Sequence, residues 1–168
     1  MQETEFFESA PIRTKLPDAP LRFILQPFLR RIVRRIAACH PGIFERVVPF
    51  QSADFIIIAH ELPFALHLRP DPKEPLLRAV SRSDLPRLDA RIEGPFFLLL
   101  NLMDGASDGD AAFFSRDLEI SGNTEAVVSL RNALDNVEGS IAQETADLFG
   151  PPGRVVLDLL RRRSNRND

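Results

Sequence analysis

Hydrophobic and polar residues alternate in three stretches in the middle of the chain. The stretches are PFALHLRP, PLLRAVSR and LDARIEG, and they lie within residues 63–70, 75–82 and 88–94. A side-chain period of two places every second residue on the same face, as in a strand that buries one side. The pattern therefore predicts three strands that contribute hydrophobic residues to a shared core.

A fourth stretch, FFSRDLEISGNTEAVVSLRNALD, predicts a strand, a tight turn and a helix. Alternating apolar and acidic residues indicate a half-buried strand over residues 113–121. Gly122 begins the turn, and the side chain of Asn123 can cap the following helix. The apolar stripe of that helix contains Val127, Leu130 and Leu134.

The stretch PLRFILQPFLRRIVRRIAACHPG predicts a basic amphipathic helix over residues 20–40. Pro27 should kink or restart it, because proline lacks the backbone N–H and crowds the preceding turn. The apolar stripe is predicted to contain Leu21, Ile24, Leu25, Phe28, Ile32 and Ile36. The opposite face is predicted to carry Arg30, Arg31, Arg34 and Arg35.

The remaining hydrophobic pattern predicts further helices and divides the chain into four regions. PFFLLLNLM, residues 95–103, predicts a buried helix, because it is long and opens after Pro95. IFERVVPF and SIAQETADLF predict further short helices. We expect a flexible arm over 1–19, the basic helix over 20–40, a folded domain over 41–150 and a C-terminal basic helix over 151–168.

Composition narrows the class of protein. The 168 residues include 13 Phe but no Trp or Tyr, and a single Cys. Phenylalanine has no polar tip, so it suits sites without hydrogen-bond partners, either in a filled core or around an apolar cavity. One cysteine excludes an internal disulfide framework. MQETEFFESA is unlike a signal peptide, and no apolar run reaches the length of a membrane span, so we expect a cytoplasmic protein.

Residues that usually carry catalysis or bind metal form no convincing constellation. Phosphate-binding, dinucleotide-binding and serine-hydrolase motifs are absent. Cys39 and His40 are adjacent in a helix and do not face each other, which favours a core cysteine and a helix-end histidine. His67 is expected to be a solvated or edge residue. DGASDGD lacks the spacing of a calcium loop. We therefore predict no metal site and no catalytic residues.

The N-terminal basic helix has three interpretations. An arginine-rich face can neutralise nucleic-acid phosphates, but the chain is acidic overall, with a net charge of −3. No nucleic acid is therefore expected as a partner. Two alternatives remain open: the apolar face is buried in the domain, or the helix contacts an anionic membrane surface. The predicted membrane-contact residues are Phe23, Phe28, Arg30, Arg31, Arg34 and Arg35.

The runs PFALHLRP, DARIEGPFFLLLNLMDG and DAAFFSRDLEISGNTEAVVSLRNALD resemble the sterol-carrier-protein lipid-binding domain family over roughly residues 40–150. Together with the basic helix, they resemble its UbiT-like subgroup, bacterial accessory factors of oxygen-independent ubiquinone biosynthesis. The resemblance implies an α+β fold in which about five strands form a mixed sheet, covered by helices that enclose an apolar lipid tunnel.

The same resemblance implies a non-catalytic protein with no cofactor. It would hold an isoprenoid quinone or a phospholipid at the membrane surface, and UbiU- and UbiV-type hydroxylase proteins would be its partners. A general phospholipid or fatty-acid carrier and a ligand-free interaction scaffold remain alternatives, and an enzyme of unknown type is a third. The inward residues predicted to line the lipid site are Leu99, Met103, Phe114, Leu118, Ile120, Leu130 and Leu134.

Overall fold

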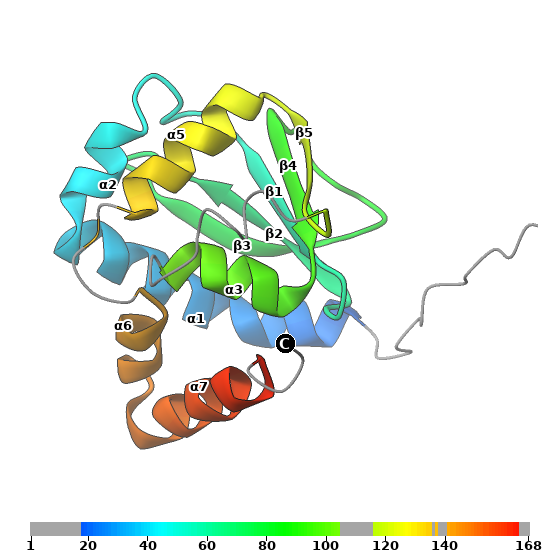
Figure 1. The fold of residues 1–168 in the computed structure, drawn as a ribbon, viewed down its shortest axis with the longest axis vertical. Coiled ribbons are helices and arrows are strands. Elements are labelled where there is room, and N and C mark those ends of the chain that lie inside the picture. The colour runs from blue at the N-terminus through cyan, green and yellow to red at the C-terminus, as the bar shows by residue number, and fades with distance from the viewer. Residues whose placement is uncertain (1–17, 105–115, 136, 138–140, 165–168) are drawn as a thin grey trace, which may run out of the picture.

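The computed structural model describes residues 18–104, 116–135, 137 and 141–164 (Figure 1). The helices are α1 (Asp18–Cys39), α2 (Pro41–Arg46), α3 (Phe96–Asp104), α5 (Thr124–Asp135), α6 (Ile141–Asp147) and α7 (Gly150–Ser164). The strands are β1 (Phe55–Ala59), β2 (Phe64–Arg69), β3 (Leu76–Ser81), β4 (Ala90–Gly94) and β5 (Glu119–Gly122).

The strands form one mixed sheet in the order β3-β2-β1-β4-β5. Strands β1 and β4 are parallel, and the other three neighbouring pairs are antiparallel. Helices α2, α3 and α5 lie over one face of this sheet, and α1 packs along the edge strand β3 (Figure 1). The predicted α+β class with a five-stranded mixed sheet is confirmed.

Strand β1 is the central strand, and no local pattern predicted it. Its sequence FIIIA is apolar throughout, because both of its faces are covered. Ile57 faces the helices, whereas Ile56 and Ile58 pack on the opposite face beneath Leu85 and Leu88. A strand buried on both sides lacks the polar alternation that marks the other strands.

The opening of helix α5 follows the predicted capping arrangement. The backbone N–H of Ala126 donates a hydrogen bond to Asn123 Oδ1 over 3.0 Å, so the predicted cap is confirmed. Gly122, just before it, has a φ of +83°, and a Cβ atom there would lie 2.4 Å from the carbonyl oxygen of Asp89. Only glycine fits this turn without strain.

Two predicted elements differ in extent from those observed. The strand expected over 113–121 is limited to β5, four residues long, which pairs with β4 at the edge of the sheet. Residues 113–115 lie outside the described part of the chain. The GPPG segment, expected to precede the last helix, forms the start of α7. Prolines are tolerated there because the first turn of a helix has no intrahelical acceptors for its N–H groups.

Helix α1 continues through Pro27 as one helix. The residues on its buried and exposed faces differ from the predicted ones. Ile32 and Ile36 face the domain interior. Ile24 and Phe28, expected on the same stripe, are 60% and 44% exposed. The prediction of one apolar face opposite one arginine face is therefore wrong. The inward apolar row includes Ile32 and Ile36 but not Ile24 and Phe28, and the outer face carries both aromatic and basic residues.

Candidate functional site

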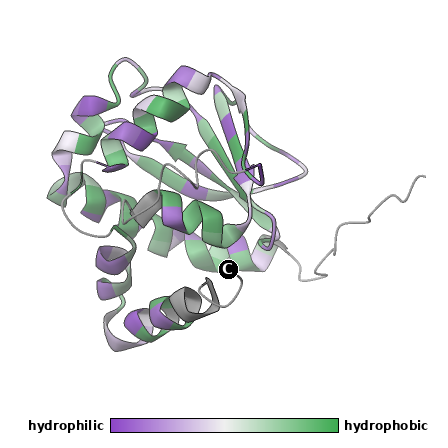
Figure 2. Ribbon diagram, in the orientation of Figure 1, coloured by the Kyte–Doolittle hydropathy of each residue, from purple (hydrophilic) through white to green (hydrophobic). Residues whose placement is uncertain are grey.

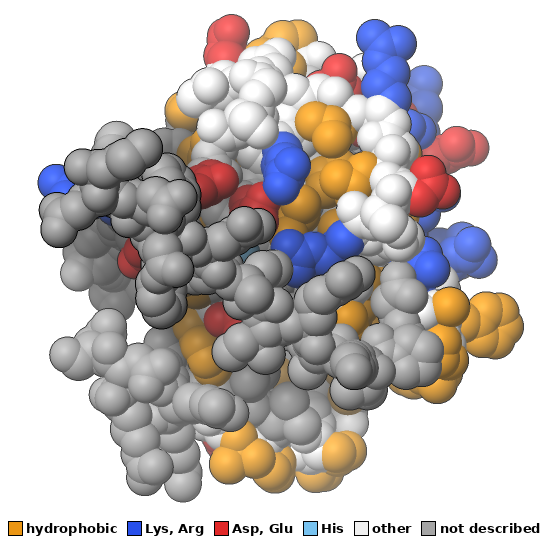
Figure 3. Space-filling model, turned by 90° about the vertical axis from the view of Figure 1, so that its right-hand side faces the viewer, with side chains coloured by type: hydrophobic (Ala, Val, Ile, Leu, Met, Phe, Trp, Pro, Cys, Tyr) orange, Lys and Arg blue, Asp and Glu red, His pale blue; other side chains and the backbone are white. Residues whose placement is uncertain are grey.

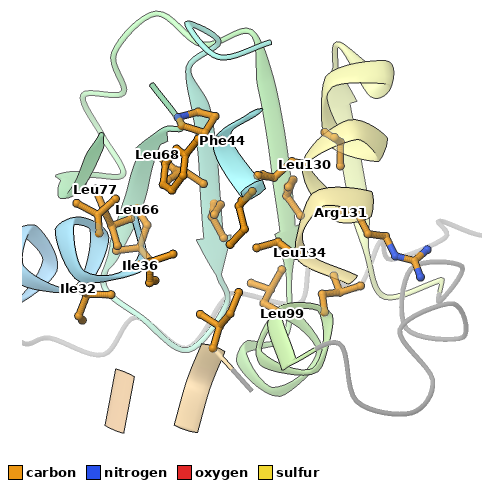
Figure 4. Close-up of a pocket in the computed structure, with 18 of the residues that line it drawn as sticks. Ile32, Ile36, Phe44, Leu66, Leu68, Leu77, Leu99, Leu130, Arg131 and Leu134 are labelled. Atoms are coloured by element: carbon orange, nitrogen blue, oxygen red, sulfur yellow. The ribbon is translucent and has the colours of Figure 1, made fainter. Parts of the chain in front are cut away.

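An apolar cavity lies between the sheet and the helices that cover it (Figure 4). Its volume is about 170 Å³, far more than the roughly 10–15 Å³ needed by one water molecule. Water gains little in such a space, because it finds no polar partners there. The cavity is therefore suited to an apolar occupant.

Helices and strands from both sides of the cavity contribute side chains to its wall. Ile32 and Ile36 come from α1, and Leu130 and Leu134 come from α5, on the other side of the cavity (Figure 4). Leu99 projects from α3, a helix that is almost uniformly hydrophobic (Figure 2). The floor comes from the sheet and the neighbouring chain, with Ile57, Leu66, Leu68, Pro70, Leu77 and Ile92.

The structure brings together four of the seven predicted lipid-site residues. Leu99, Leu118, Leu130 and Leu134 all line the cavity. Ile120 is half-buried and packs against the main hydrophobic core, without lining the cavity. Met103 belongs to α3, but its side chain is outside the described set, and Phe114 lies outside the described residues. The seven residues together remain a prediction.

Sequence reasoning missed the contribution of α1 to the cavity. Ile32, Val33 and Ile36 line it, and α1 is joined to the sheet by a hydrogen bond from Gln26 Nε2 to the carbonyl oxygen of Ala79, 2.8 Å long. The signal was present in the sequence, since Val33 lies beside Ile32 and Ile36 on a helical wheel. However, two apolar arcs compete on this helix, and the pattern alone does not show which one is buried.

The predicted membrane-contact residues all lie on the outer face of α1. Phe23 is 83% exposed, whereas Phe28 is partly covered by the ring of Phe149, whose centroid is 5.5 Å away. Hydrophobic side chains reach the surface near Lys and Arg side chains in Figure 3. The exposed arginines of α1 are Arg30, Arg31, Arg34 and Arg35.

No helix in the described part of the chain is long and apolar enough to cross a membrane. Among the same residues, no group of three or more His, Cys, Asp or Glu side chains is placed to hold a metal ion. The loop that raised the question of calcium, DGASDGD, lies largely outside the described residues.

Cys39 and His40 are neighbours at the end of α1, and their surroundings differ. The thiol of Cys39 is exposed at the end of α1, so the expectation of a core cysteine is wrong. His40 does lie at a helix end, and its Nε2 atom is 2.8 Å from both carboxylate oxygens of Glu144. This contact joins the end of α1 to α6.

His67 is the buried member of a polar cluster on the face of the sheet opposite the cavity. It is 2% exposed on the interior strand β2, so the prediction of a solvated or edge histidine is wrong. Arg78 Nε donates to His67 Nδ1 over 3.0 Å, which leaves the His67 proton on Nε2. That proton is donated to Asp54 Oδ1 over 2.6 Å. Arg69 donates to both carboxylate oxygens of Asp54.

The neighbours of Asp54 stabilise its charged form. Burial raises the pKa of the Asp54 carboxyl, but the hydrogen bonds from His67 and Arg69 and the positive charge of Arg69 outweigh it. The pKa of Asp54 therefore lies below its ordinary value of 3.8. The cluster links β2 and β3 to the segment before β1, which is a structural role.

Replacing Asp54 by Asn should lower the free energy of unfolding at neutral pH by about 2 kcal/mol, because it leaves His67 and Arg69 without their carboxylate. The pKa of Asp54 is lower in the folded state, so its stabilisation is complete above about pH 4 and is lost as the pH falls further. Urea unfolding over a pH series should show wild type and variant converging in acid. Asp84→Asn, on the exposed surface, is the control, and a constant difference between Asp54→Asn and wild type would contradict the assignment.

Comparison with known proteins places this architecture in a family. The model of the SCP-2 sterol transfer family matches residues 52–135, which is half of the chain. The chain therefore belongs to the SCP-2 sterol transfer family. The match begins before β1 and ends with α5, so it spans the sheet and two of the helices that cover the cavity.

Solved structures are similar to this chain at low sequence identity. The structure titled "UbiJ-SCP2 Ubiquinone synthesis protein" is 16% identical, with a TM-score of 0.50, and the match covers 72% of this chain and 94% of that one. Sterol Carrier Protein 2 from Yarrowia lipolytica, in its apo form, is 13% identical, with a TM-score of 0.47 and coverages of 72% and 94%. The sterol carrier protein domain 2 of Helicoverpa armigera is 13% identical, with a TM-score of 0.46 and coverages of 71% and 95%. No curated protein matches the chain significantly.

Proposed function

We propose that this protein is a non-catalytic lipid carrier that holds isoprenoid quinone precursors for oxygen-independent ubiquinone biosynthesis. The apolar cavity within an SCP-2 family domain is the observation that carries the proposal. Burying apolar surface contributes roughly 25 cal/mol per Å², so a long hydrocarbon tail needs few polar contacts to be retained. An isoprenoid tail is apolar along its whole length, which suits this wall.

Two further observations support the quinone pathway. The sequence resembles the UbiT-like accessory factors of that pathway in its strand–turn–helix unit and its basic N-terminal helix. A structure of the same fold is titled a ubiquinone synthesis protein. On this proposal, UbiU- and UbiV-type hydroxylase proteins receive the bound precursor, and the chain itself performs no chemical step.

Lipid extraction from the purified protein, followed by mass spectrometry, tests the proposal. A quinone-precursor carrier should bring prenylated aromatic lipid in preference to the bulk membrane lipids of the cell. Phospholipid or fatty acid alone would instead identify a general lipid carrier. A protein free of lipid, which also fails to bind added prenyl lipid, would be an interaction scaffold, and the proposal would fail.

The proposal places the protein at the membrane surface. Phe23 and Ile24 are 83% and 60% exposed on the outer face of α1, where the helix also carries its exposed arginines. Apolar side chains can insert at the acyl boundary while neighbouring cations contact anionic head groups. Ile32 and Ile36 of the same helix line the cavity. On this proposal, helix α1 contributes both to the membrane-contact surface and to the lipid site.

A non-catalytic role also predicts that the exposed thiol is dispensable. Replacing Cys39 by Ala should leave the cellular quinone content unchanged under oxygen-free growth, because no reacting group is assigned there. Quinone extracted from cells that carry either form of the gene is the measurement, normalised to the amount of protein. A collapse of quinone at normal protein levels would show that the chain takes part in the chemistry.

A further inference from the structure

Helix α7 carries two large apolar side chains on a side that faces solvent. Val155 and Leu159 are 58% and 61% exposed, and because they are four residues apart they lie on the same side of the helix. Leu157, between them in the sequence, is buried against Ala142 and Ala146 of α6. One side of α7 therefore holds it to α6, and another side presents an apolar pair to solvent.

Helix α7 begins beside the outer face of α1. Phe149, the residue before α7, has its ring centroid 5.5 Å from that of Phe28 on α1. Helix α7 lies at the bottom of the molecule in Figure 1, and hydrophobic side chains gather along the lower edge and the lower right of the turned view in Figure 3. Exposed apolar side chains that gather in this way mark a contact with another molecule or with a membrane.

The charge of α7 favours an anionic membrane as the partner of this apolar pair. The 15 residues of the helix include four arginines and one aspartate. On a helical wheel, the positions of Arg162 and Arg163 fall within about 60° of Leu159. An apolar stripe bordered by cations is typical of helices that lie in the plane of a membrane interface, because the cations contact anionic head groups while the apolar residues enter the acyl boundary.

We propose that the outer side of α7 is a second membrane-contact element, which inserts Val155 and Leu159 into the same anionic membrane that α1 contacts. The inference rests on the membrane placement in the proposed function and adds a second helix to that contact. Two elements fix the orientation of the domain on the membrane, whereas a single helix leaves it free to rotate about the helix axis. The second contact also raises the overall affinity, because it forms within a molecule that is already bound.

A tryptophan reporter in the full-length protein tests the proposal. The sequence contains no tryptophan or tyrosine, so an introduced tryptophan reports only its own surroundings. Leu159→Trp is mixed with vesicles of phosphatidylcholine and phosphatidylglycerol at low salt. Its emission should shift to shorter wavelength, and lipids brominated on the acyl chain should quench it, because the indole enters the acyl boundary. Val128→Trp, on the exposed side of α5, is the matched control and should show neither change.

A second variant tests the same surface without an added ring. Val155→Ser combined with Leu159→Ser should weaken binding to these vesicles roughly ten-fold, because two apolar side chains no longer move from water into the membrane. The matched control combines Val48→Ser with Val128→Ser, two exposed valines away from α7, and should bind as the wild type does. Co-sedimentation over a range of lipid concentrations measures the affinity, and the melting temperature checks that each variant is folded.

The outcomes separate this inference from the proposed function. If the wild type binds no anionic vesicles, the proposed placement at the membrane fails and the inference fails with it, whereas lipid extraction still decides the carrier function. If the wild type binds, the inference is overturned when folded Leu159→Trp shows no shift, or when the serine variant binds as tightly as the wild type. An emission that is already shifted without vesicles, and that reverts on dilution, would identify a contact between copies of the chain and would also overturn it.

Discussion

Changing Arg30, Arg31, Arg34 and Arg35 together to Glu is expected to abolish binding to anionic liposomes. All four side chains are exposed on the outer face of α1. Each surface cation gains about 1 kcal/mol near an anionic leaflet, so the four contribute on the order of 4 kcal/mol. This is roughly a thousand-fold in affinity, before repulsion by the introduced acids is counted.

Liposome flotation measures the effect. The wild type should float with anionic vesicles at low salt and less at high salt, because the attraction is screened within about 10 Å at moderate ionic strength. A control with the same change in net charge replaces four exposed cations elsewhere, Arg46, Lys73, Arg87 and Arg116, by Glu. Equal flotation of the two variants would show that the outer face of α1 is simply solvated.

Replacing Leu130 by Trp is expected to reduce the lipid bound by the purified protein several-fold. Leu130 is 5% exposed and lines the cavity from α5, so an indole ring would occupy the space of the lipid tail. Inserting bulk into a packed site usually costs about 1–3 kcal/mol of stability, but here an existing cavity can receive the ring. The measurement is lipid per protein by mass spectrometry, together with the melting temperature.

The matched control is Val128→Trp, which adds the same ring to the outer side of α5, where Val128 is 38% exposed. It should load lipid as the wild type does. Leu134→Phe is a milder filling of the same cavity, and it serves if the tryptophan variant does not fold. Unchanged loading in a folded Leu130→Trp protein would place the lipid outside this cavity.

The local pattern was sufficient wherever the two faces of an element have different chemical surroundings. The alternation in 64–69, 76–81 and 90–94 predicted strands β2, β3 and β4, because each presents different surroundings to its two faces. The cap at Asn123 was predictable for the same local reason: the donor it satisfies lies only three residues away.

The central strand and the surroundings of His67 depended on contacts between distant segments. Strand β1 pairs with β4, more than thirty residues further along the chain, and it is covered on both faces. His67 lies on the far face of the sheet, where its partner Asp54 precedes β1. The hydrophobic pattern of a short stretch of sequence cannot predict such contacts, because they form only when the sheet is assembled.

The sequence by itself determined that this protein has a basic amphipathic helix before a domain of alternating strands. Only the tertiary structure decided which face of α1 is buried, because both of its apolar arcs can satisfy a helical period and packing against β3 selects the arc with Ile32 and Ile36. The cavity was likewise decided by the tertiary structure. It is the space left between side chains of several helices and strands that are distant in the sequence, so no single segment determines its volume.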